Sequence, residues 1–98
     1  MADFEITDAD LHPHLRARML QRGITLEELQ SVFSEGWDAS GTKPGVIGKT
    51  RVFPYQAIWE DRFYEEKEVT LYYKIIDRER ILLTAKARYG KSFPGKER

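Results

Sequence analysis

We predict an α+β protein, with two N-terminal helices packed on a mostly antiparallel, four-stranded sheet, from three features of the sequence. Two amphipathic stretches, each ended by a glycine, occupy residues 10–36. Two apolar-rich runs follow in the second half and are separated by a short polar segment, as in a β-hairpin. The length of 98 residues suits one domain with one modest core.

The first helix is predicted to begin at Asp10, which would serve as its N-cap, and to end at Gly23 as a left-handed C-terminal cap. Pro13 falls within the first turn, where the missing N–H costs little. The apolar residues that recur at helical spacing are Leu11, Leu15 and Met19.

The second helix is predicted to begin at Thr25, which forms a capping box with Glu28, and to end at Gly36. The turn between the two helices is short, so they should pack as neighbours. The apolar stripe of the second helix comprises Leu26, Leu29, Val32 and Phe33.

Several short segments are predicted as strands because they alternate or are rich in β-forming residues. Phe4–Thr7 alternates apolar and polar side chains, and Trp37–Ser40 precedes a flexible loop that reaches Gly48. Thr50–Tyr55 is a strand in which Pro54 must lie at an edge or an end, since proline cannot donate to a central ladder. The tail from Lys91 onward is predicted to fray.

The strongest strand predictions are Glu66–Ile76 and Ile81–Arg88, joined as a hairpin by Asp77–Arg80. A loop of two or four residues would place Tyr73 and Ile75 beside Lys86 and Arg88. A three-residue loop would instead place Lys74 on the face of Lys86 and Arg88. The register therefore decides which side chains form a patch, and the sequence leaves both alternatives open.

The charge balance excludes a general attraction to phosphate backbones, because Lys plus Arg and Asp plus Glu both number 16. Any contact with nucleic acid must come from a local patch. The absence of cysteine excludes disulfides and thiolate chemistry. No export signal or membrane-spanning run is evident, so we expect a cytoplasmic protein with no membrane association.

The run His14–Thr25 has the spacing H-x-x-x-R-x-x-x-R-G-I-T and resembles the signature of the domain of unknown function 4258 family. That family is grouped with the RelE/ParE/BrnT toxin-like proteins. Leu82–Phe93 and Tyr64–Val69 are similar to segments of the same group. The resemblance implies two N-terminal helices on a curved sheet. It also implies a small bacterial protein of a toxin–antitoxin pair, acting on RNA or on a translation or replication target, with an antitoxin as partner.

His14, Arg18 and Arg22 stand four residues apart and line one ridge of the first helix. On the functional interpretation the arginines hold a phosphate while His14 transfers a proton during RNA cleavage. On the alternative, Arg18 and Arg22 pair with carboxylates of the sheet and His14 caps or packs.

Lys86 and Arg88 share one face of the last predicted strand, and Tyr89 follows at once. By resemblance to the toxin families, Arg88 and Tyr89 join His14 as catalytic candidates, and Lys86 joins Arg18, Arg22 and Arg51 as phosphate or RNA ligands. The alternative is a sheet edge kept soluble by Lys and Arg. Arg51 precedes aromatic residues that either stack on bases or belong to the core.

We predict no metal site and no cofactor, because His12 and His14 point apart on a helix and no further histidine exists. Two other functions remain open beside a toxin. One is a non-catalytic module that binds a partner protein or forms a homodimer, favoured by the balanced charge and by Trp37, Trp59 and Tyr64. The other is an enzyme that acts on a phosphorylated metabolite at the helix ridge.

Overall fold

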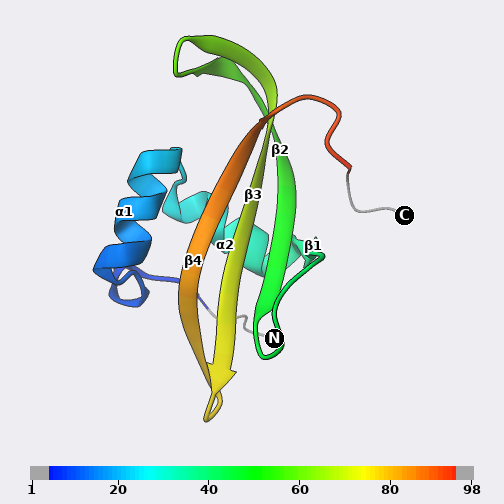
Figure 1. The fold of residues 1–98 in the computed structure, drawn as a ribbon. Coiled ribbons are helices and arrows are strands. Elements are labelled where there is room, and N and C mark those ends of the chain that lie inside the picture. The colour runs from blue at the N-terminus through cyan, green and yellow to red at the C-terminus, as the bar shows by residue number, and fades with distance from the viewer. Residues whose placement is uncertain (1–4, 95–98) are drawn as a thin grey trace.

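Two helices lie behind a four-stranded antiparallel sheet in the described part of the chain (Figure 1). The structure is a computed structural model that describes residues 5–94. The strand order is β1-β2-β3-β4, so each strand pairs with its neighbour in the chain. The predicted α+β layout is confirmed. The elements are a 3₁₀ turn (Asp8–Asp10), α1 (Pro13–Arg22), α2 (Leu26–Glu35), β1 (Trp37–Asp38), β2 (Ile47–Trp59), β3 (Arg62–Ile76) and β4 (Glu79–Gly90).

Helix α1 begins at Pro13, and its N-cap is His12, so the prediction of Asp10 as N-cap is wrong. Proline disfavours helical geometry in the residue before it, and His12 is extended. Its Nδ1 accepts the N–H of Leu15 at 3.3 Å. Asp10 belongs to the preceding 3₁₀ turn, where it accepts the N–H of Thr7 at 2.8 Å. Gly23 ends α1 in the left-handed conformation, as predicted.

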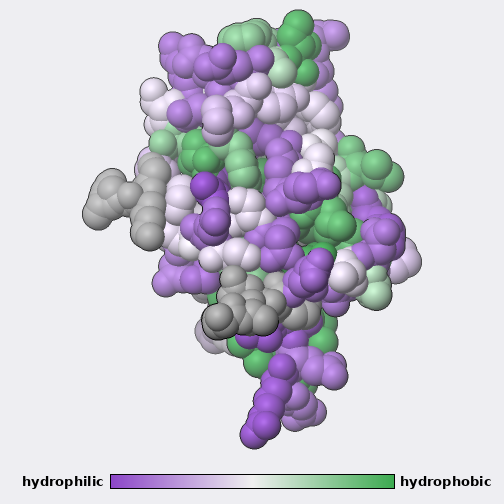
Figure 2. Space-filling view, turned by 180° about the vertical axis from the view of Figure 1, so that it is seen from behind, coloured by the Kyte–Doolittle hydropathy of each residue, from purple (hydrophilic) through white to green (hydrophobic). Residues whose placement is uncertain are grey.

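Helix α2 has the predicted capping box. The N–H of Thr25 donates to Glu28 at 3.0 Å, and the N–H of Glu28 donates to the Thr25 hydroxyl at 3.1 Å. Both helices turn their apolar stripes toward the sheet, and their outer side is largely hydrophilic (Figure 2).

The predicted strand at Phe4–Thr7 is wrong for the described residues 5–7, and Phe4 lies outside them. The N–H of Ile6 donates to the Gln30 side chain of α2 at 2.7 Å, and Thr7 caps the 3₁₀ turn. Strand β1 is shorter than predicted, and β2 is longer at both ends.

Pro54 lies in β2 beyond the two residues that pair with β1, so it occupies a sheet edge as predicted. The register of β2 with β3 shifts between Pro54 and Ala57, where Gln56 has a φ of 46°. Past this irregularity the end of the β2–β3 hairpin curls toward the side of α1 (Figure 1).

The β3–β4 hairpin has a two-residue turn, Asp77–Arg78, with φ of 51° and 71°, the backbone of a type I′ turn. The register of β3 with β4 shifts by one residue along the strands. Tyr73 pairs with Leu82, but Tyr72 pairs with Thr84 and not with Leu83. Leu83 is the extra residue of a bulge. The prediction that a two-residue loop sets Tyr73 and Ile75 beside Lys86 and Arg88 is therefore wrong; the residues opposite Lys86 and Arg88 are Thr70 and Glu68.

The two faces of the sheet differ in chemistry. The face toward the helices carries buried apolar side chains, together with Lys67. The other face, called the open face below, carries the even-numbered side chains of β3 from Glu66 to Tyr72, with their partners on β2 and β4. The core residues are Ile6, Leu11, Leu15, Met19, Ile24, Leu29, Val32, Val69, Leu71, Tyr73, Leu82 and Ala85.

The first residues of the tail, as far as Pro94, lie against the open face. The N–H of Phe93 donates to Glu66 at 2.9 Å, and the Arg88 guanidinium lies 4.9 Å from the centre of the Phe93 ring. The predicted tail beyond Pro94 lies outside the described residues.

Candidate functional site

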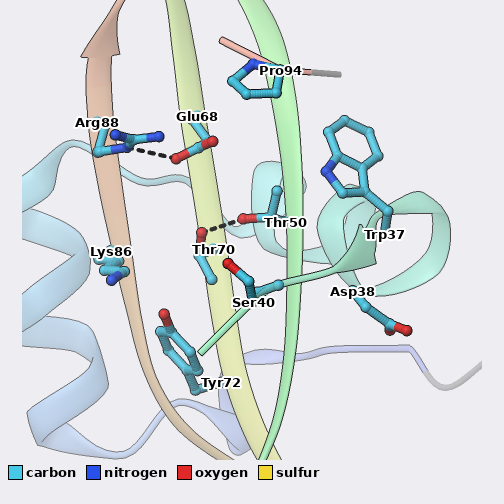
Figure 3. A pocket seen from close by; sticks show the side chains of 11 residues that line it. Trp37, Asp38, Ser40, Thr50, Glu68, Thr70, Tyr72, Lys86, Arg88 and Pro94 are labelled. Carbon is cyan, nitrogen blue, oxygen red and sulfur yellow. Dashed lines mark hydrogen bonds and ion pairs between the residues drawn. The ribbon is translucent and has the colours of Figure 1, made fainter. Parts of the chain in front are cut away.

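A groove of about 510 Å³ lies on the open face of the sheet (Figure 3). Strands β2 and β3 form its floor, Lys86 and Arg88 of β4 border one side, and the segment from Trp37 to Ser40 borders the other. Its residues are Trp37, Asp38, Ala39, Ser40, Thr50, Glu68, Thr70, Tyr72, Lys86, Arg88 and Pro94.

Gly48 makes the wall on the β1 side possible. A Cβ at this position would lie 2.7 Å from the Thr42 methyl carbon and 3.0 Å from the Ala39 Cβ. Any side chain would therefore push the segment after β1 away from the sheet. Because residue 48 is glycine, that segment passes close over β2 and gives the groove its depth.

The floor contains a buried pair of hydroxyl groups from Thr50 and Thr70, which are hydrogen-bonded to each other. The residues are 8% and 5% exposed. One hydroxyl proton makes this bond, and within residues 5–94 no protein group accepts the other. The floor therefore offers one hydrogen-bond donor to a molecule in the groove.

Arg88 and Glu68 form an ion pair across β3 and β4, with Nε donating to Oε1 at 2.7 Å. The hydrogen bond to Glu68 raises the pKa of Arg88, so the guanidinium stays charged. The Glu68 side chain is only 12% exposed, whereas that of Arg88 is 61% exposed. The carboxylate is thus recessed, and the terminal nitrogens of the guanidinium remain available at the mouth of the groove.

Lys86 supplies a charge that no carboxylate within residues 5–94 neutralises by an ion pair. Its ammonium group lies 5.5 Å from the centre of the Tyr72 ring, which orients it over the groove. Asp38, the other carboxylate at the groove, pairs with Lys49 at 2.7 Å, which lowers its pKa. On this side of the groove, Lys86 and Arg88 carry positive charges and Glu68 carries a negative charge, so the sum is positive.

The predicted helix ridge is not part of this groove. Arg22 donates to the carbonyl of Ala85 at 2.7 Å and so joins α1 to β4. Arg18 donates to Gln21 of the same helix at 2.9 Å. His14 is exposed, and its ring stacks on that of His12 with centres 6.0 Å apart. The expectation that these two histidines point apart on a helix is wrong, because His12 is the extended N-cap of α1. Since α1 packs on the side away from the open face, the expectation that the ridge and the Lys86–Arg88 pair share one pocket is wrong.

Tyr89 and Arg51 also lie on the helix side. The Tyr89 hydroxyl donates to the Arg22 carbonyl at 2.6 Å, and its ring stacks on Trp59 with centres 5.0 Å apart. Burial raises the pKa of Tyr89, so the phenol stays protonated at neutral pH. Arg51 donates to Ser31 at 2.8 Å and pairs with Glu35 of α2. Phe53, the first aromatic residue after it, is partly buried against the core, which agrees with the alternative to base stacking.

Sequence reasoning missed the floor of the groove. The signal was present in β3, where every second residue from Glu66 to Lys74 is polar or Tyr, while most residues between them, Val69, Leu71 and Tyr73, are apolar or aromatic. Such a pattern marks one face as open. The missed floor residues are Thr50, Glu68, Thr70 and Tyr72, and Ser40 of the wall was missed as well. Trp37 was singled out only as an exposed aromatic residue of a binding module.

The fold and the groove define the class of protein: an α+β domain with helices on one face of an antiparallel sheet and a cation-bearing groove on the other. No protein-family model matches the chain, and neither curated proteins nor solved structures gave a match. Among the helices of residues 5–94, none is long and apolar enough to cross a membrane.

Proposed function

We propose that the protein binds single-stranded RNA in the groove on the open face and acts as a toxin-like inhibitor. The observation that carries this proposal is the position of Lys86, an exposed cation with no carboxylate partner in the described chain, beside Arg88 and over the groove. A cation in this position favours the binding of a phosphate group.

The remaining lining residues suit a single strand. Trp37 lies at the rim and offers an aromatic face on which a base can stack. The floor hydroxyls and Glu68 lie below and can contact base edges, which are accessible only when bases are unpaired. The preference for RNA follows from the toxin-like resemblance of the sequence.

Substituting Lys86→Ala and Arg88→Ala together should weaken binding of a short single-stranded RNA by at least about 100-fold, since each charge-assisted contact contributes roughly 1.5–3 kcal/mol. The wild-type affinity should also fall with salt, with a slope of log K against log salt of roughly −1.4 for two phosphate contacts. Fluorescence anisotropy of a labelled oligonucleotide measures both quantities.

The matched control removes two positive charges elsewhere, as Arg18→Ala and Lys43→Ala. Neither residue lines the groove, so this variant should bind RNA as the wild type does. Equal losses in the two double variants would show that the groove has no special role.

Expression of the wild-type protein without any partner should arrest bacterial growth, and the Lys86→Ala/Arg88→Ala variant should restore it. A His14→Ala/Arg18→Ala variant should still arrest growth, because these side chains lie outside the groove. Colony counts after induction, with protein levels compared by immunoblot, provide the measurement. Normal growth with the wild-type protein would contradict the toxin-like part of the proposal.

A further inference from the structure

The floor of the groove contains hydrogen-bonding groups that the described chain leaves without partners. The Thr50–Thr70 pair retains one donor proton. Glu68 accepts from Arg88 through Oε1, and its Oε2 has no partner within residues 5–94. Figure 3 shows this second oxygen turned away from Arg88, toward β2. Recessed polar groups of this kind are costly when unpaired, so a bound molecule that satisfies them is favoured.

The chemistry of these groups argues against a phosphate on the floor itself. The Glu68 carboxylate would repel a phosphate, and its side chain is too recessed for water to screen it fully. The phosphate therefore belongs higher in the groove, at Lys86 and the free guanidinium nitrogens of Arg88. The floor suits a neutral group that has hydrogen-bond donors for the carboxylate and an acceptor for the hydroxyl.

Glu68 and Thr70 are two residues apart on one face of β3, so their side chains stand side by side about 7 Å apart along the strand. A planar base edge that presents donors next to an acceptor matches this arrangement. Guanine presents N1–H and N2–H as adjacent donors, with O6 as the acceptor beside them. Cytosine and adenine have only an exocyclic amine as donor on this edge, and uracil has only N3–H.

We propose that the floor of the groove recognises a guanine base in the bound RNA. Glu68 accepts from guanine N1–H and N2–H, and the Thr50–Thr70 hydroxyl pair donates to O6. A carboxylate oxygen has two acceptor sites, so Glu68 keeps its bond to Arg88 while it binds the base. Arg88 is thus a positioning residue for Glu68 as well as a phosphate ligand. This inference rests on the proposed RNA-binding function.

Oligouridylates that carry a single central guanosine, inosine, adenosine or uridine test the inference with the wild-type protein alone. We expect the guanosine RNA to bind at least about tenfold more tightly than the adenosine and uridine RNAs. Inosine lacks the N2 amine and should fall between them. Equal affinity for all four RNAs would overturn guanine recognition and leave RNA binding standing. Binding of none of them would overturn the proposed function and this inference together.

Two variants assign the preference to the floor. Glu68→Gln should bring the guanosine-to-adenosine affinity ratio close to one, since the amide nitrogen is a donor where the carboxylate has its second accepting oxygen, so it cannot pair with a guanine N–H. Thr70→Val should lower the affinity for guanosine and inosine RNAs alike. Glu65→Gln makes the same charge change on β3 outside the groove and should keep the wild-type ratio. An unchanged ratio in Glu68→Gln, with folding confirmed by circular dichroism, would contradict the assignment.

Discussion

Replacing Glu28 with alanine should lower the free energy of unfolding by roughly 3–5 kcal/mol, because it leaves a buried ammonium group without its counter-ion. Lys67 is 2% exposed, and its Nζ lies 2.8 and 3.0 Å from the two carboxylate oxygens of Glu28. The Lys67 ammonium group also donates to the Gly23 carbonyl. The ring centres of Tyr55 and Tyr89 lie 5.6 and 5.5 Å from Nζ. The pair joins α2, the turn between the helices and the centre of the sheet.

Urea denaturation measures this effect, and two further variants identify its cause. Glu27→Ala removes an exposed carboxylate from the same turn of α2 and should change the unfolding free energy by less than about 0.5 kcal/mol. Lys67→Met should cost less than Glu28→Ala, since the remaining carboxylate is more accessible to water than the ammonium. Equal stability of the Glu28→Ala and Glu27→Ala variants would contradict this account of the pair.

Replacing Gly23 with alanine should cost roughly 2–4 kcal/mol, for two additive reasons. Gly23 has a φ of 69°, which is unfavourable for residues with a Cβ. The added Cβ would also lie 2.6 Å from Trp59 Cζ3 and 2.8 Å from the Tyr89 hydroxyl oxygen. The aromatic cluster at the curled end of the sheet thus packs directly on the turn between α1 and α2.

Gly41→Ala is the matched control for this prediction. Gly41 has a similar φ of 74°, but a Cβ there would meet no atom within 4 Å. The Gly41→Ala variant should lose about 1–2 kcal/mol of unfolding free energy, which is the cost of the left-handed backbone alone. Thermal or urea unfolding of both variants separates conformational strain from packing. Losses of the same size would show that the aromatic residues do not press on Gly23.

Local signals in the sequence predicted the helices well. The Thr25–Glu28 capping box and the left-handed Gly23 depend on a few neighbouring residues, and both appear as expected. The start of α1 was misplaced because the restriction that Pro13 imposes on His12 outweighs the capping preference of Asp10. Nearby residues therefore fix the helix ends when every local rule is applied.

The register of β3 with β4 could not be predicted from the turn. Leu82 and Ala85 are both buried although they are three residues apart, and regular alternation would place them on opposite faces. The bulge at Leu83 resolves this conflict and moves Glu68 and Thr70 opposite Arg88 and Lys86. Core packing, not loop length, thus determined which side chains share the open face.

The candidate site was predicted in part. Lys86 and Arg88 do share an exposed face. Arg18 and Arg22 were predicted to bind phosphate, but the sequence does not show that α1 packs on the opposite face of the sheet. The β4 carbonyl that Arg22 binds lies 63 positions away in the chain, so its structural role appears only in the fold. The floor hydroxyls belong to Thr50 and Thr70, which are 20 positions apart in the chain. Only the pairing of β2 with β3 brings them together.

The most direct test of RNA binding on the open face is a ¹⁵N-NMR titration with a short single-stranded RNA that contains guanosine. We expect the largest amide shifts at the groove residues Trp37, Ser40, Thr70, Tyr72, Lys86 and Arg88, with α1 nearly unchanged. Shifts confined to His14, Arg18 and their neighbours on α1, with the groove unaffected, would contradict this assignment of the site.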